Sequence, residues 1–375
     1  MEQHKALDDK WYSIDNEGDV FSPALLVYPD RIEENIRRMI AVAGDADRLR
    51  PHVKTHKMPE IVRLQMKHGI RRFKCSTIAE AEMAARCSAP DVLLAYQPAG
   101  PNINRFFYLM EGYPGTKFSC IADSEDVIRL LSKTAVLKNI QTHIWLDINV
   151  GMNRTGIVPG DKAERLAELI NDMPMLRFEG LHVYDGHLHE PDPALRRKMC
   201  DESYAPVSDF IGHLEKTGIK CLKIVAGGSP TFPLHAQRKE VELSPGTLLL
   251  WDYGYSTAFT DMDFLHAAVL FTRVISKPAK DLLCIDLGHK SVASEMPQPR
   301  IKIPGSANYS IVSQNEEHMV IRTEEAGRMK IGTPVYAIPF HICPTVDRFD
   351  VVSVVRDGKV TEQWNVEARR RKITI

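Results

Sequence analysis

The sequence lacks the features of a membrane or secreted protein. Its 375 residues contain no run of about eighteen apolar residues, and the N-terminal stretch MEQHKALDDKWYSIDNEGDV is polar and acidic where a signal peptide needs an apolar core. The seven cysteines are odd in number, scattered, and form no CxxC pair, which is typical of reduced thiols. We therefore expect a cytoplasmic protein with no membrane partner.

An excess of charge of one sign is also missing. The 48 Lys and Arg nearly balance the 49 Asp and Glu, giving a formal net charge of −1. No block of about five or six like charges occurs, so a nucleic-acid partner is not expected. A chain of this length can bury the core of an enzyme, and a small-molecule substrate fits better.

The first two thirds of the chain alternate short apolar runs with amphipathic stretches. This pattern predicts repeated βα units and a parallel sheet. The predicted strands are ALLVY, FKCST, VLLAYQ, KFSCIA, THIWLDIN, EGLHVY and CLKIVAGG. The predicted helices, from apolar spacings of three and four, cover residues 31–43, 59–68, 78–86, 124–133, 162–172 and 205–217. So many units before residue 250 predict an α/β fold with a closed (β/α)8 barrel.

After about residue 262 the helical pattern gives way to apolar alternation broken by turns, as in DVVSVVRDGKVTEQW. Asp357-Gly358 within that run is a hairpin signal, because such turns need positive φ. We predict a barrel over residues 24–262 and a mainly β domain formed by residues 1–23 and 263–375.

The densest polar segment is RPHVKTHK, residues 50–57. One interpretation is a solvated basic turn. The other is functional, because active sites of barrels lie at the carboxyl ends of the strands and a desolvated lysine can form a Schiff base. The residues alone leave both open.

RPHVKTHK resembles the lysine segment of the D-threonine aldolase and D-serine dehydratase family, whose members bind pyridoxal 5'-phosphate on an alanine-racemase-type barrel. The resemblance implies that Lys54, rather than Lys57, forms the Schiff base, with His52 in the same cofactor site.

Two further segments resemble the same family. DINVGMNRTG is similar to the loop that brings an arginine, here Arg154, to the phenolic oxygen of the cofactor. GLHVYDG is similar to the strand whose tyrosine, here Tyr184, meets the pyridine ring; a buried core tyrosine is the alternative.

Two glycine-containing turns, VAGGSPT and LSPGT, are candidates for the cofactor phosphate. Backbone amides at such turns bind phosphate, and glycine lets the backbone approach closely. The resemblance places the phosphate between them, with Gly227, Gly228, Ser229, Ser244, Gly246 and Thr247 as binding residues. Alanine racemases have an arginine against the pyridine nitrogen where Ser244 stands, which argues against a racemase.

His341 and Cys343 form a candidate divalent-metal pair, because residues i and i+2 of a strand share a face. Simple packing is the alternative. The pair resembles the family's metal ligands: histidine-x-cysteine is expected for zinc and the dehydratases, whereas histidine-x-aspartate is expected for manganese or magnesium and the aldolases. The following PTVDRFD is more similar to the aldolases.

The family's aldolases have a histidine six residues after the tyrosine, as the proposed base for the substrate hydroxyl, but this chain has Glu190 there. His187 and His189 are therefore the candidate bases, with metal binding or surface exposure as alternatives.

The resemblance implies a lyase that cleaves a D-3-hydroxy amino acid to glycine and an aldehyde, dependent on pyridoxal 5'-phosphate and Zn, Mn or Mg. The alternatives are a dehydratase that gives a 2-keto acid and ammonia, an amino-acid racemase, and a non-catalytic pyridoxal-phosphate carrier. The resemblance also implies a homodimer.

Overall fold

The computed structural model describes residues 10–220, 223–306, 308–372 and 374. Residues 1–9 of the polar N-terminal stretch, and Cys221 and Leu222 of the predicted strand CLKIVAGG, lie outside the described residues. The chain divides into two compact units, the first formed by residues 1–35, 249–257 and 264–366, the second by residues 36–248, 258–263 and 367–375.

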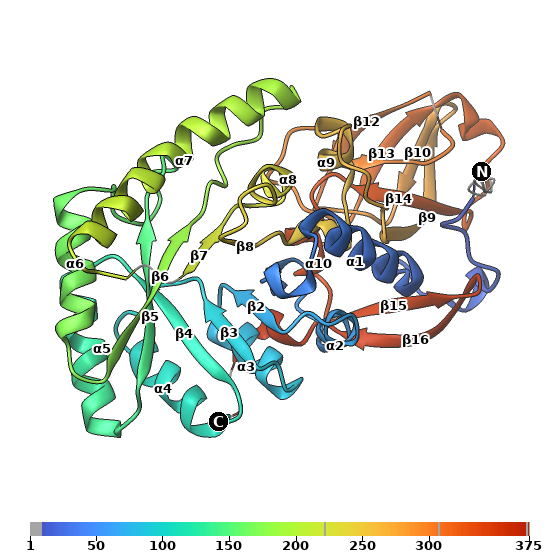
Figure 1. The fold of residues 1–375 in the computed structure, drawn as a ribbon. Helices are drawn as coiled ribbons and strands as arrows, with labels where there is room; N and C mark the ends of the chain where they lie inside the picture. The colour runs from blue at the N-terminus through green and yellow to red at the C-terminus, as the bar shows by residue number, and fades with distance from the viewer. Residues whose placement is uncertain (1–9, 221–222, 307, 373, 375) are drawn as a thin grey trace, which may run out of the picture. The chain divides into compact units, whose positions relative to one another are not determined.

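The second unit is built on a seven-stranded parallel sheet whose strands follow one another in sequence order. The strands are β2 (Arg72–Cys75), β3 (Asp91–Leu94), β4 (Lys117–Ala122), β5 (Thr142–Ile148), β6 (Leu176–Val183), β7 (Lys223–Ala226) and β8 (Val241–Leu243). The helices between them are α2 (Pro59–Lys67), α3 (Ile78–Arg86), α4 (Asn102–Gly112), α5 (Glu125–Lys138), α6 (Asp161–Asp172), α7 (Pro193–Lys216) and α8 (Phe232–His235). Figure 1 shows α4 to α7 along one side of the curved sheet, which confirms the predicted α/β fold class.

The segment before η3 (Val53–Thr55) closes this sheet. Leu49 bridges to Leu243 of β8 and His52 bridges to Lys74 of β2, both in parallel. The backbone amide of His52 also donates to the carbonyl of Pro245 at 2.8 Å. Residues 49–52 therefore take the eighth position, so that the chain enters η3 from the wall of the barrel.

The first unit contains a nine-stranded, mostly antiparallel sheet, as predicted for the C-terminal part. Its strands are β1 (Ala24–Val27), β9 (Ala268–Ala279), β10 (Leu282–Ile285), β11 (Ile301–Lys302), β12 (Tyr309–Gln314), β13 (Met319–Thr323), β14 (Pro334–Pro339), β15 (Val351–Arg356) and β16 (Lys359–Asn365). Helices α1 (Pro29–Ala43), α9 (Tyr253–Ala258) and α10 (Ile342–Val346) complete the described helices. The hairpin predicted at Asp357-Gly358 is confirmed, with φ of 48° and 73°.

Strand β1 differs from the prediction. The run ALLVY was expected in the barrel, but β1 pairs antiparallel with β9 and parallel with β15. A short run of apolar residues fits the interior of either sheet, because its pattern does not identify its neighbours.

Each of the six predicted helices is present, but the described helices α4, α8, α9 and α10 were not predicted. The buried face of α4 is made by Ile103, Phe106, Phe107 and Leu109. Helix α7 begins at Pro193 and not near residue 205, where it was predicted to begin. Proline is typical of a first helical turn, but Pro206 lies inside this helix.

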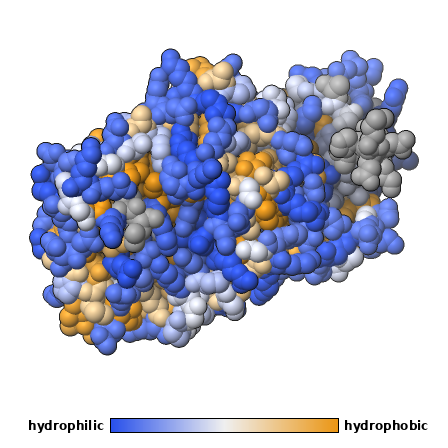
Figure 2. All heavy atoms as spheres, in the orientation of Figure 1, coloured by the Kyte–Doolittle hydropathy of each residue, from blue (hydrophilic) through white to orange (hydrophobic). Residues whose placement is uncertain are grey.

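Of the helices in the described ranges, none combines the length and apolar character that crossing a membrane requires. The face drawn in Figure 2 is mostly hydrophilic, with apolar residues in scattered spots. None of the six described cysteines forms a disulfide.

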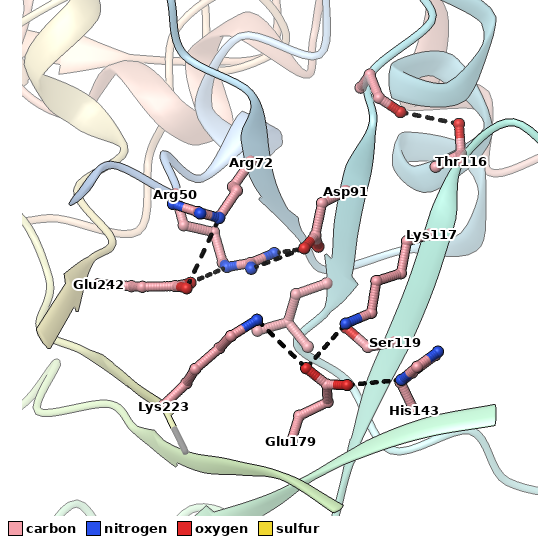
Figure 3. Close-up of polar contacts among 12 residues, drawn as sticks. Arg50, Arg72, Asp91, Thr116, Lys117, Ser119, His143, Glu179, Lys223 and Glu242 are labelled. Atoms are coloured by element: carbon pink, nitrogen blue, oxygen red, sulfur yellow. Dashed lines mark hydrogen bonds and ion pairs between the residues drawn. The ribbon is translucent and has the colours of Figure 1, made fainter. Parts of the chain in front are cut away.

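Buried ion pairs gather where the barrel strands begin. The guanidinium of Arg50 is fully buried and contacts Asp91 at 2.6 Å and Glu242 at 2.7 Å. Burial opposes ionisation of Asp91, but Arg50 holds the pKa of this carboxyl below its ordinary value. Figure 3 shows this cluster beside a second one, in which Glu179 accepts from Lys117 and His143 and pairs with Lys223. The first cluster links the closing segment to β3 and β8, and the second links β4, β5, β6 and β7.

Replacing Arg50 with Met should lower the free energy of unfolding by about 3 to 5 kcal/mol, because two largely buried carboxylates lose their counter-ion. The measurement is urea denaturation followed by circular dichroism. The control is Arg72→Met, since Arg72 is partly exposed and lies 3.7 Å from the same Glu242; its loss should cost about 1 kcal/mol or less. Equal losses for the two variants would contradict the assigned role of Arg50.

Candidate functional site

A cavity of about 540 Å³ opens where the barrel strands end. Its walls come from η3, from the last residues of β2, β5 and β6, and from the loops that follow β3, β4 and β5. The polar side chains that line it include Lys54, Lys74, Asp123, Asp147, Arg154 and Tyr184. The carboxyl ends of barrel strands are the usual place of an active site.

Lys54 lies in η3, the short helix that follows the closing segment. Its backbone amide donates to Nδ1 of His52 at 3.3 Å, so the predicted His52 caps the helix that carries the lysine. Burial, together with the charges of Lys54 and Lys74, lowers the pKa of His52 well below its ordinary value. His52 is therefore neutral and acts as an acceptor.

Lys57 has a different environment. Its Nζ donates to Glu80 Oε1 at 2.8 Å, and both side chains are buried. Lys57 does not line the cavity, whereas Lys54 does. This separation supports the prediction that Lys54 carries the cofactor.

Tyr184 is the centre of a positively charged group. Lys54 Nζ lies 5.5 Å, Lys74 Nζ 5.2 Å and the Arg154 guanidinium carbon 5.0 Å from the centroid of its ring. Gly186 has no room for a side chain, because a Cβ there would lie 2.3 Å from the ring. A planar anionic ligand against this ring would meet three cations, which fits the pyridine ring and phenolic oxygen of pyridoxal 5'-phosphate.

The two predicted phosphate loops lie side by side. The amides of Gly246 and Thr247 both donate to Ser229 Oγ, at 3.2 and 3.1 Å. Ser244 Oγ is buried and has no hydrogen-bond partner among the described residues. Amides that converge on one oxygen, as these two do on Ser229 Oγ, are the kind of donor that binds a phosphate, so the loops fit the group expected between them.

Asp185 links the end of β6 to the first of these loops. It accepts from the Gly228 amide at 3.0 Å, from Thr231 Oγ1 at 2.9 Å and from His235 Nε2 at 2.8 Å. Gly227 has φ of +83°, and a Cβ there would lie 2.8 Å from the His235 ring. The hydrogen bonds of Asp185 to Gly228, Thr231 and His235 therefore fix the loop of residues 227–231 next to Tyr184.

Several polar residues of the cavity were missed by the sequence analysis, and three of them lie on the barrel strands. Lys74 on β2, Asp147 on β5 and His182 on β6 are all nearly completely buried and line the cavity. Asp147 Oδ1 and His182 Nδ1 lie 2.7 Å apart. Their signal in the sequence is only a polar residue inside an apolar run, which does not reveal that three separated strands bring them together.

The two candidate bases lie outside the residues that line the cavity. His187 is half-buried, with its Nε2 3.2 Å from the position a Cβ on Gly151 would take, and His189 is exposed. Their proposed role stays a prediction.

The candidate metal pair lies just after β14, in the first unit. His341 precedes α10 and Cys343 lies within it, so the expected strand geometry is wrong. Within this turn Thr345 Oγ1 donates to the His341 carbonyl at 2.7 Å. The two side chains are nevertheless in hydrogen-bond contact.

The surroundings of His341 favour a cation. Its Nδ1 lies 2.5 Å from Glu295 Oε1. Burial alone would lower the pKa of His341, but the contact with Cys343 and the charges of Asp252 and Glu295 raise it to about 9. An imidazole held by a carboxylate, beside a thiol, is a donor set that fits zinc.

Comparison with known proteins places this site in a family. Residues 27–255 match the family model of the alanine racemase N-terminal domain, and residues 267–355 match that of the serine dehydratase domain. The chain belongs to the alanine racemase N-terminal domain family. The predicted alanine-racemase-like fold is thereby confirmed.

Relatives in this family include lyases. The chain is 28% identical over 356 residues to a D-threonine aldolase from an Arthrobacter species, covering 93% of both chains. The structure of D-threonine aldolase from Filomicrobium marinum is similar with a TM-score of 0.88 and 27% identity, covering 96% of this chain and 98% of that one. D-threo-3-hydroxyaspartate dehydratase from Delftia sp. HT23 shares the fold, with a TM-score of 0.83, 21% identity and coverage of 94% and 98%. These relatives confirm the prediction of an enzyme of the lyase class.

Replacing Lys54 with Ala should prevent covalent attachment of the cofactor, whereas Lys57→Ala should leave it intact. The measurement is borohydride reduction of the cofactor-loaded protein and peptide mass spectrometry, which should find the modified residue at Lys54. Lys57→Ala should instead lower the free energy of unfolding by about 3 to 5 kcal/mol, because Glu80 is left buried without its counter-ion. Attachment at Lys57 would show that the assignment is wrong.

Proposed function

We propose that the protein is a pyridoxal-phosphate- and divalent-metal-dependent lyase that cleaves a D-3-hydroxy amino acid to glycine and an aldehyde. The observation that carries the proposal is the position of Lys54, in a cavity at the carboxyl ends of the barrel strands with Tyr184 and Arg154 beside it. Similarity to a D-threonine aldolase over nearly the whole chain supports the retro-aldol reaction.

The cofactor residues have separate tasks in this proposal. Bound pyridoxal 5'-phosphate supplies an electron sink for the bond broken at Cα. Lys54 holds it covalently, Tyr184 packs on its ring, and Arg154 binds its phenolic oxygen. The two loops that contain Gly228 and Ser229, and Gly246 and Thr247, would bind its phosphate, and Ser244 would face its pyridine nitrogen. His341 and Cys343 would hold a metal that polarises the 3-hydroxyl of the substrate.

A dehydratase is the second candidate, and Cys343 is the observation that favours it. A thiol ligand selects zinc over manganese or magnesium. Two solved structures of D-threo-3-hydroxyaspartate dehydratase are mutants in which a histidine and a cysteine two positions apart are each replaced by alanine, and the cysteine mutant is described as metal-free. His341 and Cys343 have the same spacing.

A racemase and a non-catalytic cofactor carrier have less support. A racemase is disfavoured by Ser244, which stands where alanine racemases have an arginine. A carrier built on a barrel alone is disfavoured because residues 267–355 match a second domain model. The homodimer and the cytoplasmic location stay predictions.

Product analysis tests the reaction. The cofactor- and zinc- or manganese-loaded protein should release glycine and acetaldehyde from D-threonine and leave L-threonine unchanged. Formation of 2-ketobutyrate and ammonia would show a dehydratase. Appearance of L-allo-threonine, the Cα epimer of D-threonine, would show a racemase, and each of these results would overturn the aldolase proposal.

Replacing Cys343 with Ala should lower bound metal and activity without releasing the cofactor, because a ligand is lost while the barrel site is unchanged. Metal is measured by mass spectrometry after dialysis, and cofactor by visible absorbance. The matched control is Cys284→Ala, a buried cysteine on β10 of the same unit. Equal metal content in the two variants would refute the site.

A further inference from the structure

Lys74 is a buried cation for which the proposed function has no task. Its side chain comes from β2, is 2% exposed, and lines the same cavity as Lys54. Its Nζ lies 5.2 Å from the Tyr184 ring centroid, close to the 5.5 Å of Lys54. Two lysines therefore face one tyrosine ring.

No carboxylate of the described residues forms an ion pair with Lys74. Two acids, Asp185 and Asp147, act on it through their charge, and each also has another hydrogen-bond partner, although Asp147 Oδ2 is buried without one among the described residues. Asp147 bonds to His182, and Asp185 bonds to Gly228, Thr231 and His235. Buried charges are normally paired, so an ammonium left without a partner next to a cavity indicates an anion that comes with the ligand.

The other cations of the cavity already have partners in the proposed function. Lys54 holds the cofactor, Arg154 binds its phenolic oxygen, and the two glycine loops bind its phosphate. An amino acid joined to the cofactor through its amine still brings one negative group, its carboxylate. Lys74 is the lysine of this cavity that lacks a counterpart.

We propose that Lys74 binds a carboxylate of the amino-acid substrate and so selects substrates that carry one. This inference rests on the proposed function. Asp147 and His182 are positioning residues in this arrangement, because the hydrogen bond between His182 Nδ1 and Asp147 Oδ1 fixes the carboxylate whose charge acts on Lys74.

The charge of Lys74 is sensitive to its neighbours. Burial, followed by the charges of Lys54 and Arg154, lowers the pKa of Lys74 to about 7, while Asp185 and Asp147 oppose the shift. His52 and His182 face the same space and have lowered pKa values, so they are neutral. Lys74 is thus charged below about pH 7 and neutral above it in the free enzyme.

Ligand pairs that differ by one carboxylate test the inference on the cofactor-loaded enzyme. D-Alanine and D-alaninol both have the amine, lack the 3-hydroxyl that cleavage requires, and differ in the carboxylate. Their dissociation constants come from the change in visible absorbance on binding. Lys74→Met should raise the dissociation constant of D-alanine by about tenfold or more and leave that of D-alaninol nearly unchanged. Equal effects on the two ligands, or no effect on this pair and on the pair described next, would overturn the inference.

A second pair identifies which carboxylate is bound. Lys74→Met could raise the dissociation constant of D-aspartate more than that of D-asparagine and change neither constant of the D-alanine pair. The bound group is then a side-chain carboxylate, and the substrate is a dicarboxylic amino acid. If none of these ligands changes the absorbance of the wild-type enzyme, the proposed function fails and the inference fails with it.

Two controls separate binding from a structural role. Lys117→Met removes a lysine at the opposite end of the barrel, in the Glu179 cluster of Figure 3, and should change neither dissociation constant. Lys74→Met should not lower the urea midpoint, because it removes a buried charge that has no partner. A lowered midpoint together with equal effects on both ligands would mean that Lys74 serves as a counter-ion of Asp147.

The pH dependence gives an independent readout. In the wild-type enzyme the preference for D-alanine over D-alaninol should shrink as the pH rises above about 7, because the ammonium form is lost. In Lys74→Met the preference should be small at every pH. A wild-type preference that is constant from pH 6 to pH 9 would contradict the inference.

Discussion

The position of Lys54 depends on the buried guanidinium of Arg50. Arg50 contacts Asp91, the first residue of β3, and Glu242 of β8, so it links the closing segment to these two strands. The backbone then pairs with β8 and β2 up to His52, and η3 begins immediately afterwards. Ion pairs hold the closing segment at Arg50, and backbone hydrogen bonds hold it along its length. The position of Lys54 in the cavity is therefore fixed by the segment that precedes it.

The two ends of the barrel treat charge differently. Where the strands begin, each acid of the clusters in Figure 3 is met by a base: Asp91 and Glu242 by Arg50, and Glu179 by Lys117, Lys223 and His143. Where the strands end, cations surround Tyr184 and the acids are bonded to other groups. At the first end the acids and bases neutralise one another, whereas the second end presents cations to the cavity.

The residues that were predicted from the sequence lie in contiguous motifs. RPHVKTHK identified Lys54, and GLHVYDG identified Tyr184, because each motif is a local signal. Lys74, Asp147 and His182 are single polar residues within strands, and their meeting depends on which strands face the same space. The geometry of His341 and Cys343 was also out of reach, since the short helix α10 follows β14 where apolar alternation predicted a strand. Helix positions followed well from periodicity, but the partners of β1 did not, because pairing is not encoded in the run itself.

The pairing of β1 has a consequence for synthesis. Leu26 on this strand is a neighbour of Val269 and of Ser353, so the sheet that contains it needs residues from both ends of the chain. The barrel strands β2 to β8, in contrast, pair in order along the chain. During translation the barrel can assemble strand by strand, while β1 must wait until β15 has left the ribosome. The barrel that carries Lys54 can therefore form before the sheet next to the candidate metal ligands is complete.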